Sequence, residues 1–106
     1  MNKIPVTPEG RPGIWLVEPS AVATWLETYP EDKIHNFICG SIMIGADWER
    51  ASVIEHLGHP LTERVALMTG NAQSGNMGHA LAVIHDNTLY TFDIGPITEA
   101  DLEILP

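Results

Sequence analysis

The chain has 106 residues, enough for one domain with a modest hydrophobic core. Fourteen acidic residues against five Lys and Arg give a formal net charge of −9, and no Lys or Arg follows Arg64. Because such a surface repels nucleic-acid phosphates, we expect no direct binding of DNA or RNA. No apolar run approaches the roughly 20 residues of a membrane helix, so no membrane association is expected either.

The beginning of the chain and its cysteine content favour a cytoplasmic location. Residues 1–13 contain three prolines and two glycines, which predicts an irregular lead-in, and no apolar segment typical of a secretory signal precedes the first element. The single cysteine, Cys39, cannot form an internal disulfide, as expected in a reducing compartment. We therefore predict a single cytoplasmic domain spanning residues 1–106.

The first half of the chain predicts short strands and two helices. Residues 14–17, IWLV, indicate a buried strand. The next helix follows Pro19 and ends at Pro30, because apolar side chains recur there at helical spacing. Those side chains are Val22, Trp25, Leu26 and Tyr29. Residues 33–46 are expected to form an extended segment with a break near residues 39–41, or alternatively a buried helical turn. Asp47 is expected to cap a second helix that ends at Gly58.

The second half predicts three strands, near residues 64–69, 78–84 and 88–94. Thr98 and Asp101 resemble a capping box, which indicates a last short helix. The fold class is therefore α+β: a small antiparallel sheet of these strands and the N-terminal extended segments, packed with two or three short helices. The most buried side chains are expected to be Trp25, Leu26, Trp48, Ile54, Leu67, Val83 and Phe92.

The register of the hairpin between the last two strands decides whether His79 can meet Asp93. A three-residue loop at residues 85–87 places the two side chains opposite each other, on one face of the sheet. A two-residue turn at Asp86 and Asn87 places them on opposite faces. The three-residue loop is favoured here, because Asp-Asn lacks the glycine preferred in two-residue turns. A carboxylate beside the imidazole fixes its tautomer, as the base of a thiol nucleophile requires.

Residues 64–95, RVALMTGNAQSGNMGHALAVIHDNTLYTFDIG, resemble the C-terminal half of papain-like folds. The likeness is to papain-fold toxin and effector deamidases, and more distantly to transglutaminase-like and NlpC/P60-like domains. It implies that His79 is the general base and Asp93 its orienting carboxylate. Cys39, the only thiol, would then be the nucleophile, and Asn36 is the candidate oxyanion donor. No cofactor is implied.

Two functions from different classes follow. The first is a papain-like cysteine hydrolase or side-chain amide deamidase acting on a protein substrate. The alternative is a non-catalytic acidic protein that docks on a basic partner, such as a phage- or plasmid-type inhibitor (for example an anti-CRISPR) or an immunity protein. No metal site is predicted, because His56 and His59 lack an evident third ligand. His35 and His85 are interpreted as surface residues.

Overall fold

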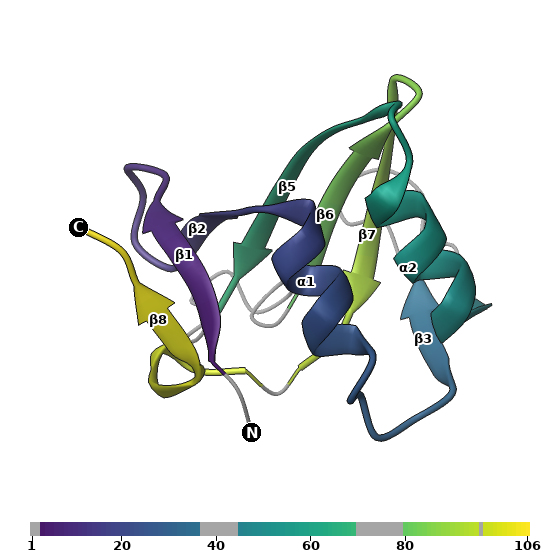
Figure 1. Ribbon diagram of the computed structural model, residues 1–106, viewed down its shortest axis with the longest axis horizontal. Coiled ribbons are helices and arrows are strands. Elements are labelled where there is room, and N and C mark those ends of the chain that lie inside the picture. The colour runs from purple at the N-terminus through teal and green to yellow at the C-terminus, as the bar shows by residue number, and fades with distance from the viewer. Residues whose placement is uncertain (1–2, 37–44, 70–79, 96) are drawn as a thin grey trace.

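The computed structural model describes residues 3–36, 45–69, 80–95 and 97–106 (Figure 1). In chain order the elements are β1 (Ile4–Pro8), β2 (Ile14–Val17), α1 (Pro19–Leu26), β3 (Lys33–Asn36), β4 (Ala46–Glu49), α2 (Arg50–Gly58), β5 (Thr62–Met68), β6 (Ala80–His85), β7 (Thr88–Asp93), the 3₁₀ turn η1 (Glu99–Asp101) and β8 (Leu102–Ile104).

The described strands form one sheet in the order β4-β3-β7-β6-β5-β2-β1-β8. Strand β8 pairs in parallel with β1, whereas the other neighbouring strands are antiparallel. Helices α1 and α2 lie side by side over one face of the sheet (Figure 1). The α+β class is thus confirmed, but the sheet is mixed and not wholly antiparallel.

The hydrophobic core lies between the two helices and the sheet. Leu81 of β6 stands opposite Phe92 of β7, and both side chains are buried. Of the side chains expected in the core, those of Trp25, Leu26, Leu67, Val83 and Phe92 are buried. Those of Trp48 and Ile54 are only partly buried and pack against the core from its margin.

Both ends of the chain contain a strand that was not predicted: β1 in the segment expected to be irregular, and β8 in the segment expected to be helical. Residues 4–8 form β1, because Ile4 and Val6 alternate with more exposed positions and fill the core face. The capping box of Thr98 and Asp101 is present, but the helical turn stops at Asp101 and the chain continues as β8 beside β1. In both segments strand pairing outweighs the local signals of proline and of the helix cap.

The second helix begins two residues later than predicted. Asp47 lies within β4, opposite His35 of β3, and Glu49 occupies the N-cap position of α2. The backbone pairing of β4 with β3 therefore extends past the residue that the sequence marks as a cap.

The hairpin between β6 and β7 has a two-residue turn, so the predicted three-residue loop is wrong. His85 pairs with Thr88, and the two turn residues have φ of 50° (Asp86) and 61° (Asn87). A turn of the type I′ class needs positive φ at both positions, and Asp and Asn tolerate that backbone without glycine. Within the described ranges no helix is long and apolar enough to cross a membrane.

Candidate functional site

Two members of the predicted Cys39–His79–Asp93 triad, Cys39 and His79, lie outside the described residues. Asp93 ends β7, where it is exposed and stands opposite Ala80. The expected pairing with His79 rested on the three-residue loop, which the structure does not have. One oxygen of Asp93 accepts a hydrogen bond from the backbone N–H of Gly95, at 3.2 Å.

Asn36, the candidate oxyanion donor, is buried in the sheet. Its side chain is 6% exposed, and its Nδ2 donates a hydrogen bond to the backbone oxygen of Thr91 at 3.2 Å. This contact links β3 to β7 and satisfies a buried polar group, as a structural asparagine does. The amide is thus already engaged in holding the two strands together.

His35 is the site residue that the sequence interpretation passed over. It lies on β3 between two carboxylates, opposite Asp47 of β4 on one side and Asp93 of β7 on the other. Its Nδ1 lies 3.1 Å from Oδ1 of Asp47. The alternation of exposed and buried positions along Lys33–Asn36 is the signal that places this histidine on the outward face.

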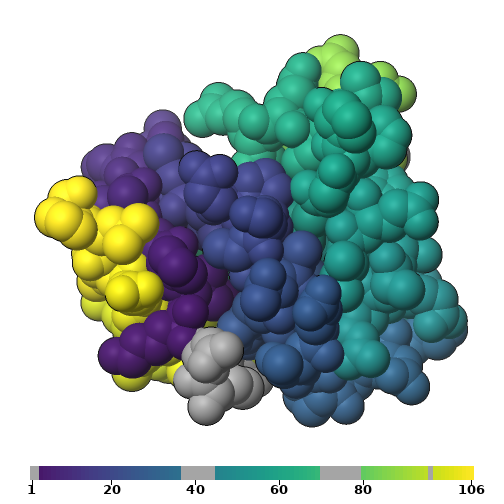
Figure 2. Space-filling model, in the orientation of Figure 1, coloured from purple at the N-terminus to yellow at the C-terminus, as the bar shows by residue number. Residues whose placement is uncertain are grey.

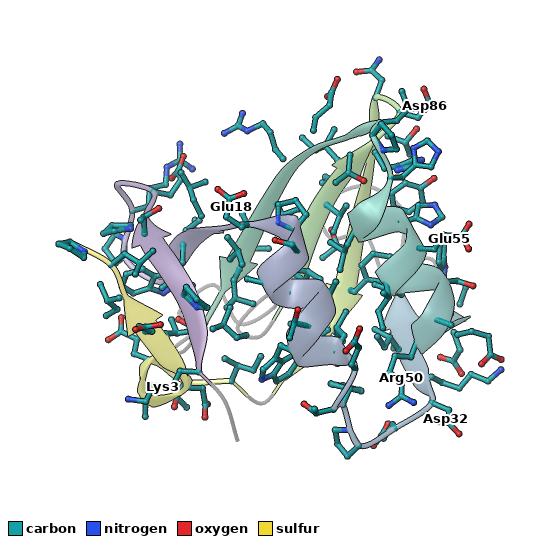
Figure 3. The ribbon with its side chains drawn as sticks, in the orientation of Figure 1. Lys3, Glu18, Asp32, Arg50, Glu55 and Asp86 are labelled. Carbon is teal, nitrogen blue, oxygen red and sulfur yellow. The ribbon has the colours of Figure 1, made fainter. Side chains whose placement is uncertain are left out.

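Six carboxylates lie around this end of the sheet and the adjoining helix ends, a region here named the acidic edge. They belong to Glu27, Glu31, Asp32, Asp47, Glu49 and Asp93. The two cations among them are engaged in ion pairs, Lys33 with Glu49 at 2.8 Å and Arg50 with Asp32 at 3.5 Å. Figure 3 shows Asp32 and Arg50 together, far across the molecule from Lys3. Six acids and two cations leave a local net charge of −4.

A shallow open pocket of about 360 Å³ lies in the acidic edge. Its wall combines carboxylates with the apolar surface of Ala51 and Ile54, and its full lining is Glu27, Asp32, Glu49, Arg50, Ala51 and Ile54. These residues come from the end of α1 and the beginning of α2, whose surfaces meet on the face shown in Figure 2. A lining that combines apolar side chains with carboxylates suits the aliphatic stem and charged head of a Lys or Arg side chain.

The negative potential of the acidic edge affects nearby titrating groups. Burial raises the pKa of the Tyr29 phenol above its ordinary value, and the charges of Glu31 and Asp93 raise that pKa further. The hydrogen bond that Lys33 donates to Glu49 and the negative charge of Glu49 raise the pKa of the Lys33 ammonium, and Asp47 and Asp32 raise that pKa to a smaller extent. In both cases the carboxylates of the acidic edge contribute to the rise in the pKa of a neighbouring group.

The acidic edge also opposes the dipole of α1. Glu27 occupies the C-cap position of this helix, and Glu31 and Asp32 follow within a few residues. The C-terminus of a helix carries partial negative charge, so carboxylates there are unfavourable by about 0.3–1 kcal/mol each when exposed. Local rules are broken most often where function requires it, which makes this arrangement a candidate interaction site.

Comparisons with protein-family models, with curated proteins and with solved structures find no match to this chain. The resemblance of residues 64–95 to papain-like folds therefore stays a prediction. The candidate site rests on the geometry and charge of the chain itself.

Proposed function

We propose that the protein is a non-catalytic acidic binding protein that docks on a basic macromolecular partner through the acidic edge. The observation that carries this proposal is that the only Lys and Arg among its six carboxylates already have partners, so the excess negative charge faces solvent. Complementary charge steers a basic partner to such a surface and orients it there.

The partner is expected to insert a Lys or Arg side chain into the pocket beside Glu27. Ala51 and Ile54 offer apolar contact to the stem of that side chain, and Glu27 and Glu49 line the same pocket with their carboxylates. The proposed partner is a protein and not a nucleic acid, because the phosphates of a nucleic acid would be repelled by the carboxylates of this surface.

The test compares two triple variants that remove the same charge from different places. Glu27→Gln, Glu31→Gln and Asp47→Asn neutralise carboxylates of the acidic edge that form no described ion pair with Lys or Arg. The matched variant carries Glu9→Gln, Glu99→Gln and Glu103→Gln, three exposed acids outside the acidic edge. Both variants have a net charge of −6, three units less negative than the native −9.

Binding of a peptide rich in lysine and arginine is measured by calorimetry at several salt concentrations. Three exposed ion pairs at about 0.5 kcal/mol each amount to about 1.5 kcal/mol, so the edge variant should bind about tenfold more weakly. The matched variant should keep the native affinity within about twofold. Equal weakening in both variants would show that net charge alone governs binding, and would refute a docking site at the acidic edge.

A second proposal, the cysteine hydrolase or amide deamidase, is favoured by one observation. An imidazole flanked by two carboxylates, His35 with Asp47 and Asp93, is an arrangement that supports proton transfer. Cys39 lies four residues further along the chain. In this mechanism the Cys39 thiolate attacks a side-chain amide carbonyl, ammonia leaves with a proton from the imidazole, and water hydrolyses the thioester.

His79 is the base expected from the papain-like resemblance, and His35 is the competing candidate. The rate of alkylation of Cys39 against pH, in the native protein and in His35→Ala and His79→Ala, separates them. The base is the histidine whose removal slows alkylation at neutral pH. Alkylation of the native protein no faster than that of free cysteine would refute the catalytic proposal.

A further inference from the structure

Three histidines that are not part of the acidic edge meet where α2 ends and the β6–β7 hairpin turns. His56 lies in the last turn of α2, His59 directly follows that helix, and His85 ends β6. The imidazole of His85 has its ring centre 4.4 Å from that of His56 and 4.9 Å from that of His59. Figure 3 shows this corner of the molecule beside the labelled Asp86. The sequence predicted no metal site here, because His56 and His59 lack an evident third ligand and His85 was interpreted as a surface residue.

The hydrogen bonds of this cluster define which nitrogen of each neutral ring carries the proton. The Nδ1 of His56 lies 3.1 Å from the backbone oxygen of Ser52, which can only accept, so this Nδ1 donates. The Thr62 hydroxyl donates its hydrogen to the backbone oxygen of His56. The Thr62 oxygen must therefore accept from the Nδ1 of His85, which lies 3.2 Å away.

His56 and His85 consequently have an unprotonated Nε2 in their neutral forms. His59 differs, because its Nδ1 accepts a hydrogen bond from the backbone N–H of Leu61, at 3.1 Å. Its neutral ring then carries the proton on Nε2. Metal-binding histidines commonly donate one ring N–H to an oxygen and bind the metal through the other nitrogen. Within this cluster of three, His56 and His85 are in that state and His59 is not.

The spacing of the two rings suits a shared metal ion. Two imidazoles bound at about 90° with metal–nitrogen distances of about 2.1 Å have ring centres roughly 4.5 Å apart. The observed separation is 4.4 Å, with the ring planes inclined by 47°. Right angles between nitrogen ligands are typical of tetragonal Cu²⁺ and Ni²⁺ sites.

We propose that His56 and His85 form a two-imidazole site for a divalent transition metal, Cu²⁺ or Ni²⁺, completed by water. The ring of Trp48 lies 5.1 Å from that of His56 and forms an apolar wall beside the pair. The net charge of the protein favours the approach of a cation.

The test is titration of the full chain with Ni²⁺ at neutral pH, followed by calorimetry and by paramagnetic broadening of backbone amide signals. His56→Gln and His85→Gln should each weaken Ni²⁺ binding by at least about tenfold. Loss of a hydrogen bond that supports a metal ligand already weakens binding by about tenfold or more, and loss of the ligand itself should cost at least as much. His59→Gln should leave the affinity within about twofold, since its lone pair is already used. His35→Gln is the matched control, an exposed imidazole bonded to Asp47 on another part of the sheet.

Thr62→Val provides a second variant that keeps both ligands. It removes the oxygen that holds His85 in its metal-binding tautomer, and should weaken Ni²⁺ binding about tenfold. Broadening should centre on residues near the end of α2 and the hairpin turn. The two-imidazole assignment would be overturned if His56→Gln and His85→Gln both kept the native affinity for Ni²⁺, or if His59→Gln lost as much affinity as they do. Near-UV circular dichroism of each variant tests whether a loss of affinity comes from misfolding.

Discussion

Removal of the Phe92 side chain is expected to be among the most destabilising single truncations in the sheet. The side chain is 1% exposed, and its ring lies 5.4 Å from that of Trp48 in an edge-on contact and 6.2 Å from that of Tyr90 in a stacked one. Phe92→Ala removes buried apolar atoms and leaves a cavity, which costs about 3–5 kcal/mol. The free energy of unfolding of a domain is about 5–15 kcal/mol in total, so this loss is a large fraction of it.

The assay is urea denaturation followed by tryptophan fluorescence and by far-UV circular dichroism. Leu89→Ala is the matched control, because Leu89 lies three residues earlier on β7 and is 47% exposed. We expect Leu89→Ala to change the free energy of unfolding by no more than about 1 kcal/mol. If the two variants lost equal stability, Phe92 would not be packed between the sheet and the helices, and the assignment of the two faces of β7 would be refuted.

Three further outcomes follow from the same structure. Tyr29 should ionise above the ordinary phenol pKa of 10.0, so the folded state keeps this proton to higher pH than the unfolded state, and the free energy of unfolding should fall as pH rises past about 10. Spectrophotometric titration should show a smaller shift of the Tyr29 pKa in Glu31→Gln. An unchanged shift would contradict the contribution of the Glu31 charge. Asn87→Val should cost about 1–2 kcal/mol in thermal or urea unfolding, whereas Asn87→Gly should not, because φ is 61° there. Cysteines at positions 84 and 89 should form a disulfide on mild oxidation in a background without the native cysteine, because Ile84 stands opposite Leu89; a failure to cross-link would contradict the two-residue turn.

The elements with strong periodicity were predictable from the sequence. The helical spacing of Val22, Trp25 and Leu26 correctly indicates α1 and its buried face, and alternation within residues 88–94 correctly indicates β7. The strands at the two ends of the chain were not predicted. β1 pairs with β2, and β8 exists through its pairing with β1 across nearly the whole length of the sequence. No local signal reports such a pairing, whereas prolines and a helix cap are visible at once.

The candidate site depends on register, which the sequence expresses only weakly. The side-chain period of a strand is two, so one residue more or less in the hairpin turn moves every side chain of β7 to the other face. With the turn at Asp86 and Asn87, Asp93 shares a face with His35, although the sequence suggested His79 as its partner. Identifying this neighbour needs the β3–β7 pairing, which joins segments that are distant in the sequence and which the break predicted near residues 39–41 does not indicate. The charges of the acidic edge are visible in the sequence, but their convergence depends on three strands and two helix ends meeting at one side of the sheet.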